Sequence, residues 1–402
     1  MSDDVSDTNC IKGGDFVIVK AENTLRLVEL NKSKPYYLGK RKANLYFAIG
    51  QPYGSFFEIK PDGNLKKSAA AEVDESLNVK VGNDEETKDN RALIDTGNSQ
   101  KLTTVDIEAY KAQGLSGQEM VKIIVENSSS FREKTLFSKE KYLRKKQSKY
   151  MKFVQLLKPN VRLLAEMYYS QGPLKICNLR IDSLSQMLAF CNIMSGCKYM
   201  IIETVCGLLT ASVLERIGVH GCVIQMHLGP SSKNPCQQTI KALNIPATTM
   251  ESLLYNIDLK NAMKILQQEK ADDGSEACNS SATDKKPKLA KEHYGNKAKE
   301  ILSYRDMDSL LVAVKHHPAN VLPLIDFLAF SRPFAIFSMF QEPLVDCYVN
   351  LKSRGDIILL NISETWFRRY QVLPDRTHPC YTMSGNGGFL LTGIKVDKKA
   401  LY

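Results

Sequence analysis

The chain has 402 residues, 43% of them hydrophobic, and it carries a formal net charge of +10 at pH 7. A hydrophobic fraction of this size excludes a wholly disordered protein, and the length allows two or three domains. The excess of cations favours an acidic partner, nucleic acid first and an anionic membrane surface second.

No secretory or membrane-spanning segment is visible. The start of the chain has no basic stretch followed by an apolar run, and runs such as 334–340 are far shorter than the ~20 residues of a spanning helix. The ten cysteines include no CxxC pair, and most lie within apolar runs. This usage is typical of buried free thiols in a reducing compartment, so we expect a cytoplasmic or nuclear protein with no metal site.

Residues 1–65 contain short β-rich runs separated by turn signals. The runs are DFVIVK (15–20), TLRLVEL (24–30) and ANLYFAIG (43–50), and PDGN (61–64) closes the last hairpin. Short strands at this spacing predict a small antiparallel β-barrel.

A polar, acidic segment without sustained periodicity follows over 66–100, and it predicts a flexible linker. Helical signals then run over 101–155, where Thr103 with Asp106 forms a capping-box pattern. The last part of this helical arm, 131–150, holds eight lysines and arginines against two glutamates.

The cations of this basic arm would surround a helix almost completely and leave a narrow seam at Tyr142, Leu143 and Tyr150. So many like charges repel one another unless a polyanion such as a phosphate backbone neutralises them. The pattern favours RNA or DNA binding, with a merely solvated arm as the alternative. The aromatics either stack on unpaired bases or pack the arm onto its domain. The candidate RNA-binding residues of the arm are Lys134, Lys139, Lys141, Tyr142, Arg144, Lys145, Lys146 and Lys149.

From 156 to 402, apolar strands alternate with amphipathic helices, which predicts a Rossmann-like domain with a mostly parallel, doubly wound sheet. The expected strands are 199–203, 222–227, 309–314, 334–339, 356–361 and 388–396. A helix is expected near 249–268, and a polar, disordered insert over 267–300. Within the insert, KKPKLAK (285–291) resembles a nuclear import signal, so the expected location is the nucleus.

The turn after the first strand of this domain, TVCGLLT (204–210), does not have the composition of a nucleotide-binding loop. It contains one glycine, Gly207, where such loops need two or three so that backbone N–H groups can approach a ligand. Val205 and Leu208 would fill the space of a cofactor's carboxylate or phosphate. We predict no cofactor-binding residues here.

The other positions where an enzyme of this fold carries functional groups are also unusual. The second strand ends in His227 where a carboxylate would hold ribose hydroxyls, and 309–325 contains no Asp or Glu. His316 and His317 could do acid–base work, or they could lie in a loop at a domain rim or subunit contact. We therefore predict a non-catalytic chain whose fold serves packing and assembly.

Three stretches resemble one family. GLSGQEMVKIIVENSSSFREKTLFSKEKYLRKKQSKY (114–150), ETVCGLLTASVLERIG (203–218) and RTHPCYTMSGNGGFLLTGIKV (376–396) are similar to the non-catalytic, RNA-binding subunit of the eukaryotic tRNA (adenine-N1)-methyltransferase. The resemblance covers 101–250 and 302–396. It implies a heterotetramer of two such subunits with two S-adenosylmethionine-dependent catalytic subunits, which forms 1-methyladenosine in the T-loop of tRNA. The cofactor would belong to the catalytic partner.

The connection before the last strand adds candidates outside the arm. Arg376 and His378 would contact a ribose, a phosphate or the partner subunit, and Arg368 and Arg369 are weaker candidates of the same kind. Trp366 would anchor a domain or subunit interface. The glycines at 385, 387 and 388 predict a tight turn.

Two other functions stay open. One is a self-sufficient RNA methyltransferase with a degenerate cofactor loop that uses His227 or His316. The other is an RNA-binding, translation-factor-like protein whose barrel contacts RNA. Methyl transfer by the purified chain alone would favour the first, and co-purification without a methyltransferase partner the second.

Overall fold

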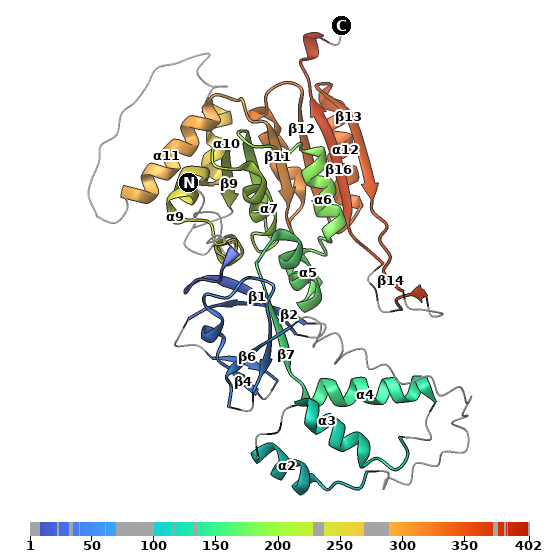
Figure 1. Ribbon diagram of the computed structural model, residues 1–402. Helices are drawn as coiled ribbons and strands as arrows, with labels where there is room; N and C mark the ends of the chain where they lie inside the picture. The colour runs from blue at the N-terminus through green and yellow to red at the C-terminus, as the bar shows by residue number, and fades with distance from the viewer. Residues whose placement is uncertain are drawn as a thin grey trace, which may run out of the picture. The chain divides into compact units, whose positions relative to one another are not determined.

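The computed structural model describes residues 9–400 with several gaps, and Figure 1 labels its elements. The gaps are 22–23, 32–34, 40, 61, 70–99, 114, 116, 132–134, 228–236, 269–288, 373–376, 382 and 384. The chain divides into two compact units, Met1–Pro159 and Asn160–Tyr402. In the described part of the chain, no helix is long and apolar enough to cross a membrane.

The first unit contains a five-stranded antiparallel sheet in the order β2-β1-β7-β5-β6. Its strands are β1 (Phe16–Ala21), β2 (Thr24–Glu29), β5 (Phe56–Ile59), β6 (Leu65–Ser68) and β7 (Phe153–Leu157). Strands β3 (Tyr36–Leu38) and β4 (Arg41–Ala43) form a separate hairpin. The predicted barrel is not confirmed, because no pairing among the described strands joins the edge strands β2 and β6.

One predicted strand of this unit is wrong. The run ANLYFAIG contains a short 3-10 helix, η2 (Leu45–Ala48). Leu45 and Ala48 are its buried residues. Their spacing of three matches one turn of such a helix, so both side chains face the same core.

Strand β7 lies at the centre of this sheet although it follows the helical arm in the chain. Val154 pairs with Phe57 of β5, and Leu157 pairs with Ile18 of β1. Alternate residues of β7 are buried, which fixes its register. The arm is therefore an insertion between β6 and β7. The first unit ends at Pro159. The sequence analysis instead placed the end of the arm at residue 155 and the start of the next domain at residue 156.

The arm comprises α2 (Thr104–Ala112), α3 (Gly117–Glu126) and α4 (Leu136–Tyr150). The predicted capping box is confirmed, because the Thr103 N–H donates to Asp106 Oδ2 at 2.9 Å and the Asp106 N–H donates to Thr103 Oγ1 at 3.3 Å. A small core joins α3 to α4, with Met120, Ile124, Leu143, Tyr150 and Met151 among its buried members.

The second unit contains a seven-stranded sheet in the order β10-β9-β8-β11-β12-β16-β13. Its strands are β8 (Lys198–Glu203), β9 (Cys222–His227), β10 (Leu254–Asp258), β11 (Ser309–Ala313), β12 (Arg332–Ser338), β13 (Ile357–Glu364) and β16 (Phe389–Lys395). The first five strands in this order, from β10 through β9, β8 and β11 to β12, run parallel to one another. Strand β16 is antiparallel to both of its neighbours, β12 and β13. A mixed, mostly parallel sheet agrees with the sequence prediction. A two-stranded ribbon of β14 (Tyr370–Gln371) and β15 (His378–Pro379) lies on the connection from β13 to β16.

Helices cover this sheet. They are α5 (Val161–Gln171), α6 (Ile181–Phe190), α7 (Leu208–Ile217), α8 (Gln237–Lys241), α9 (Ala247–Leu253), α10 (Leu259–Gln268), α11 (Leu289–Ser303) and α12 (Glu342–Arg354), with 3-10 helices η4 (Pro173–Ile176), η6 (Pro318–Phe327) and η7 (Lys398–Ala400). Figure 1 shows α6 and α7 over one face of the sheet. Met200 and Ile202 of β8 share a hydrophobic core with Leu344 and Leu351 of α12.

Two predictions for this unit need correction. The expected helix near 249–268 is interrupted by strand β10, whose buried Tyr255 and Ile257 alternate with less buried residues. Helix α11 occupies 289–303, so the end of the predicted disordered insert is helical. Most of the basic cluster 285–291 lies outside the described residues.

Candidate nucleic-acid interface

Helix α4 exposes a row of cations on one side and packs with the other. Lys141, Arg144, Lys145 and Lys149 are exposed, whereas the chain turns Leu143, Gln147 and Tyr150 into the interior. The sequence pattern placed cations around the whole helix, but packing against α3 restricts the solvent-facing charges to one face. Such a face can follow a phosphate backbone.

Other predicted residues of the arm have different surroundings. Lys139 is only 7% exposed, so it is not part of the solvent-facing row. Tyr142 packs against Phe131 with ring centroids 5.5 Å apart, and Lys146 Nζ lies 5.2 Å from the Tyr142 ring centroid. These contacts support the packing role for the aromatic residue over base stacking. Lys134 lies outside the described residues.

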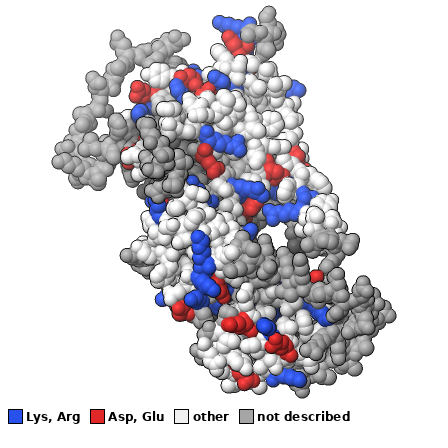
Figure 2. Space-filling view, viewed as in Figure 1, with Lys and Arg blue, Asp and Glu red and all other residues white. Residues whose placement is uncertain are grey.

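The charged side chains of α4 are almost all cationic. Figure 2 shows cationic and acidic side chains interspersed on the face that it presents. The four exposed cations of α4 have Glu140 as the acid within their own helix. The arm is therefore the clearest local concentration of positive charge that the described side chains form along one helix.

The turn from β8 to α7 is filled by the protein itself. Val205 and Leu208 have no exposed surface, as the sequence predicted from their apolar character. Cys206 and Gly207 have φ angles of 62° and 81°, so the turn uses one non-glycine residue in a left-handed conformation. Loops that hold a nucleotide place glycines here to open space for the ligand, whereas this turn has one glycine and two buried apolar side chains.

Glu203, the last residue of β8, occupies the N-terminus of α7. Its Oε1 accepts hydrogen bonds from the Thr210 N–H at 2.7 Å and from the Thr210 hydroxyl, and its Oε2 accepts from the Leu209 N–H at 3.3 Å. Burial raises the pKa of Glu203, although the hydrogen bonds from Thr210 and Leu209 oppose that change. The amide groups that could bind a ligand's anionic group are thus already used.

The turn from β8 to α7 therefore differs from a glycine-rich nucleotide-binding loop in its composition and in the use of the Leu209 and Thr210 amides. Sequence reasoning missed the role of Glu203, because the pairing of an acid with a threonine seven residues later has no established sequence signature. Within the described ranges, no group of three or more His, Cys, Asp or Glu residues is placed to hold a metal ion.

The buried Glu203 carboxyl predicts a measurable pH dependence. Because its pKa is raised in the folded protein, the folded state retains this proton at a pH where the unfolded chain has lost it. Its contribution to the free energy of unfolding therefore falls as pH rises from its unfolded pKa toward its folded pKa. In urea unfolding, the stability advantage of wild type over Glu203→Gln should be larger near pH ~5 than near pH ~7.5. An advantage that grew with pH would contradict this arrangement.

Polar side chains also lie at or after other strand ends of this sheet. His317 caps η6: its Nδ1 accepts from the Ala319 N–H at 3.3 Å, and its Nε2 lies 3.2 Å from Asp346 Oδ2. His227 lies in register with Asp258 of β10. Asp258 was missed as a strand-end acid because β10 was interpreted as helix, and its Oδ1 accepts from the Lys260 N–H at 2.8 Å.

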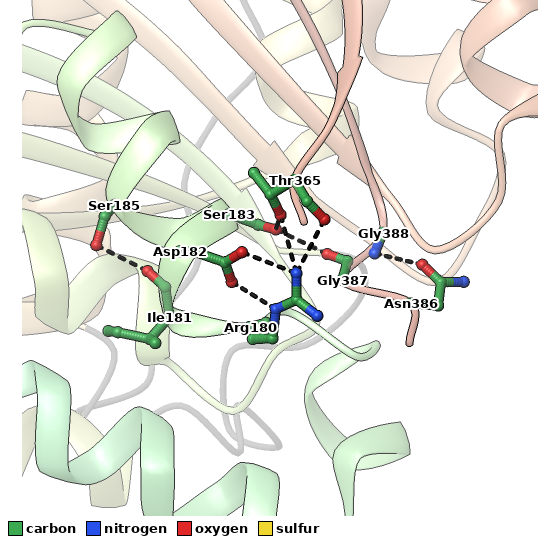
Figure 3. Close-up of polar contacts among 9 residues, drawn as sticks. All are labelled: Arg180, Ile181, Asp182, Ser183, Ser185, Thr365, Asn386, Gly387 and Gly388. Atoms are coloured by element: carbon green, nitrogen blue, oxygen red, sulfur yellow. Dashed lines mark hydrogen bonds and ion pairs between the residues drawn. The ribbon is translucent and has the colours of Figure 1, made fainter. Parts of the chain in front are cut away.

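A buried arginine organises the connection that contains His378. Arg180 is 6% exposed, and its Nε and Nη2 donate to Asp182 Oδ1 and Oδ2 at 2.6 and 2.8 Å. Arg180 Nη2 also donates to the carbonyl of Thr365 at 2.9 Å, and Ser183 Oγ donates to the carbonyl of Gly387 at 2.8 Å (Figure 3). The N-terminal part of α6 thus holds both ends of the 365–387 connection.

Two glycines of this connection are required by their surroundings. A Cβ on Gly387 would lie 2.7 Å from Arg180 Cζ, and Gly388 has a φ of 74°. Gly385 has no such neighbour, so the tight turn that the sequence predicted depends on the last two glycines. His378 is partly buried on β15, and Arg376 lies outside the described residues.

Comparison with known proteins gives matches along nearly the whole chain. The family model described as the Gcd10p family matches residues 10–293. A mouse protein named tRNA (adenine(58)-N(1))-methyltransferase non-catalytic subunit TRM6 is 34% identical, over 98% of this chain and 90% of that protein. A Dictyostelium discoideum protein named as the same subunit is 31% identical, over 97% of this chain and 80% of that protein.

Two crystal structures share the fold. One is a SAM-dependent O-methyltransferase from Thermotoga maritima, 12% identical, with a TM-score of 0.52 over 97% of this chain and 96% of that one. The other is the tRNA (m1A58) methyltransferase TrmI from Aquifex aeolicus, 11% identical, with a TM-score of 0.50 over 97% of this chain and 100% of that one. The second unit shares its Rossmann-like fold with these two proteins. On the strength of the family model and the end-to-end similarity to the named relatives, this chain belongs to the Gcd10p family.

Proposed function

We propose that this chain is the non-catalytic subunit of a tRNA (adenine-N1)-methyltransferase. In this function it binds tRNA and assembles with a catalytic subunit that methylates N1 of a T-loop adenosine. The observation that carries the proposal is the near full-length similarity to relatives that bear this name, at 34% and 31% identity. The proposed complex contains two copies of each subunit, and its proposed location is the nucleus.

The turn between β8 and α7 supports a division of labour between the two subunits. Val205 and Leu208 fill the turn, and Glu203 uses the amide groups of Leu209 and Thr210. In a chain with these residues, the methyltransferase fold serves assembly with the partner subunit and not cofactor binding. The methyl donor, S-adenosylmethionine, would then be held by the catalytic partner.

The exposed cations of α4 support the tRNA-binding part. Lys141, Arg144, Lys145 and Lys149 face solvent on a helix whose opposite side is anchored by Leu143 and Tyr150. An anchored helix presents its charges at fixed positions, so binding a phosphate backbone costs less ordering of the protein.

The proposal predicts that the isolated chain does not bind S-adenosylmethionine. Isothermal titration calorimetry should give no saturable heat with the chain alone. The reason is that Val205 and Leu208 would occupy the cofactor's space in the β8–α7 turn, and Glu203 already accepts the hydrogen bonds of backbone amides at the start of α7. The assembled complex should give saturable heat under the same conditions. Micromolar binding to the chain alone would contradict this part and favour a self-sufficient enzyme.

A further inference from the structure

Exposed aromatic side chains gather on the connection between β13 and β16. Trp366 is 76% exposed, Tyr370 54% and Tyr381 91%. A single exposed apolar residue is ordinary, but three large aromatics on one short connection form an unusual surface. The sequence suggested that Trp366 anchors an interface, and its exposure shows that nothing within the described chain covers it.

The ribbon places these side chains on a defined framework. Tyr370 is paired with Pro379, and the Cys380 N–H donates to the Arg369 carbonyl at 2.9 Å. The His378 and Tyr381 rings lie with their centroids 5.4 Å apart. Tyr370 therefore extends from a paired backbone, and Tyr381 follows β15 by two residues.

The base of the ribbon is fixed to α6. Arg180 donates to the Thr365 carbonyl next to Trp366, and Ser183 donates to the Gly387 carbonyl two residues before β16 (Figure 3). Asp182 holds the Arg180 guanidinium through two hydrogen bonds, and the Phe367 ring centroid lies 5.7 Å from Arg180 Cζ. Both ends of the connection are thus held by one buried polar cluster while the aromatic residues stay exposed. A surface fixed in this way loses little conformational entropy when it binds a partner.

Charge distinguishes between two classes of partner. Arg368 and Arg369 are exposed directly between Trp366 and Tyr370. The sequence of 365–381 contains three arginines and one acidic residue, Asp375. At the centre of a protein–protein contact, two adjacent guanidinium groups would need two buried acidic partners to offset their desolvation. Single-stranded nucleic acid offers bases for the aromatic rings and phosphates for the arginines.

We propose that the described residues of 365–381 form a second RNA-binding surface that stacks on unpaired bases. Trp366 and Tyr381 serve as stacking platforms, and Arg368 and Arg369 contact the adjacent phosphates. Arg180 is a positioning residue that fixes the base of this surface. The inference rests on the proposed function, because it assigns a second contact with the same tRNA.

Trp366 is the only tryptophan of the chain, so the intrinsic fluorescence of the full chain reports on this site directly. Titration with a single-stranded oligoadenylate should quench the fluorescence, and an RNA duplex of equal length should quench it much less. Trp366→Ala should weaken binding of labelled tRNA about 5- to 100-fold, as expected for the loss of one stacked base. Trp366→Phe should retain most of the affinity, and Tyr304→Ala, which removes an aromatic 65% exposed elsewhere in this unit, should change nothing.

The outcomes separate this inference from the proposed function. Unchanged tRNA affinity in Trp366→Ala, with weakened affinity after alanine replacement of the α4 cations, would overturn the inference and leave the proposed function standing. Quenching by the catalytic subunit but not by RNA would also overturn it, because the surface would then be a protein contact. Failure of the wild-type complex to bind tRNA at all would overturn the proposed function itself.

Discussion

Replacing Lys141, Arg144, Lys145 and Lys149 with alanine is expected to weaken tRNA binding by the assembled complex about 100-fold at ~0.15 M salt. All four side chains are exposed on one face of α4. Four lost phosphate contacts should also reduce the steepness of log Kd against log salt concentration by about 3 to 4. Filter binding or fluorescence anisotropy at several salt concentrations measures both quantities.

The matched control removes the same charge from a different surface. The second unit offers four exposed lysines for this control, Lys241, Lys260, Lys264 and Lys299. Their replacement by alanine lowers the net charge by the same amount as the α4 substitutions. This control should keep most of the salt dependence if α4 is the phosphate-binding face. If the quadruple α4 variant kept the wild-type dependence of log Kd on log salt concentration, the arm would not be part of the RNA interface.

Gly388→Ala is expected to lower the free energy of unfolding by about 2–4 kcal/mol. Gly388 has a φ of 74°, and an added Cβ would lie 2.3 Å from Phe337 Cζ and 2.9 Å from the Ser338 carbonyl oxygen. Phe337 is fully buried in the sheet, so it has little room to move. Thermal or urea unfolding of the full chain measures the difference.

The neighbouring glycine provides the control for this substitution. An added Cβ on Gly385 meets no atom within 4 Å, and Gly385 is not among the positive-φ residues. Gly385→Ala should therefore stay within about 0.5 kcal/mol of wild type. Equal stability of the two variants would show that the close approach of Gly388 to Phe337 is not required for folding.

The sequence predicted the sheet of the second unit well because its central strands are continuous apolar runs. Strands β8, β9 and β11 are buried along most of their length, so their sequences contain the signal directly. Strand β10 was missed because it has five residues and lies between two helices without a glycine or proline at either junction.

In the first unit, too, a strand was missed because the local sequence does not specify its place in the sheet. Strand β7 directly follows a basic helix, and its role at the centre of the sheet depends on pairing with β1 and β5, far away in the chain. Nothing local to 153–157 specifies those partners. The sheet of this unit could therefore be recognised from its β-rich runs, but its order and its inserted arm could not.

The candidate site was predictable in its chemistry and not in its geometry. The basic composition of α4 is visible in the sequence, but the burial of Lys139 depends on how the helix packs in the fold. Glu203 and Thr210 are seven residues apart, and Arg180 and Thr365 are 185 apart, so the fold alone brings each pair together. The apolar residues of the β8–α7 turn could be identified directly, because Val205 and Leu208 have no polar group to offer a ligand.

The most direct test of the central claim measures methyl transfer to tRNA with radiolabelled S-adenosylmethionine. The purified chain, a purified catalytic subunit and the two co-expressed together would be assayed on the same tRNA, with native mass spectrometry to establish the composition of the complex. The proposed function predicts no transfer by this chain alone, and methylation at N1 of a T-loop adenosine by a complex with equal numbers of both subunits. Methyl transfer by this chain in the absence of any partner would contradict it.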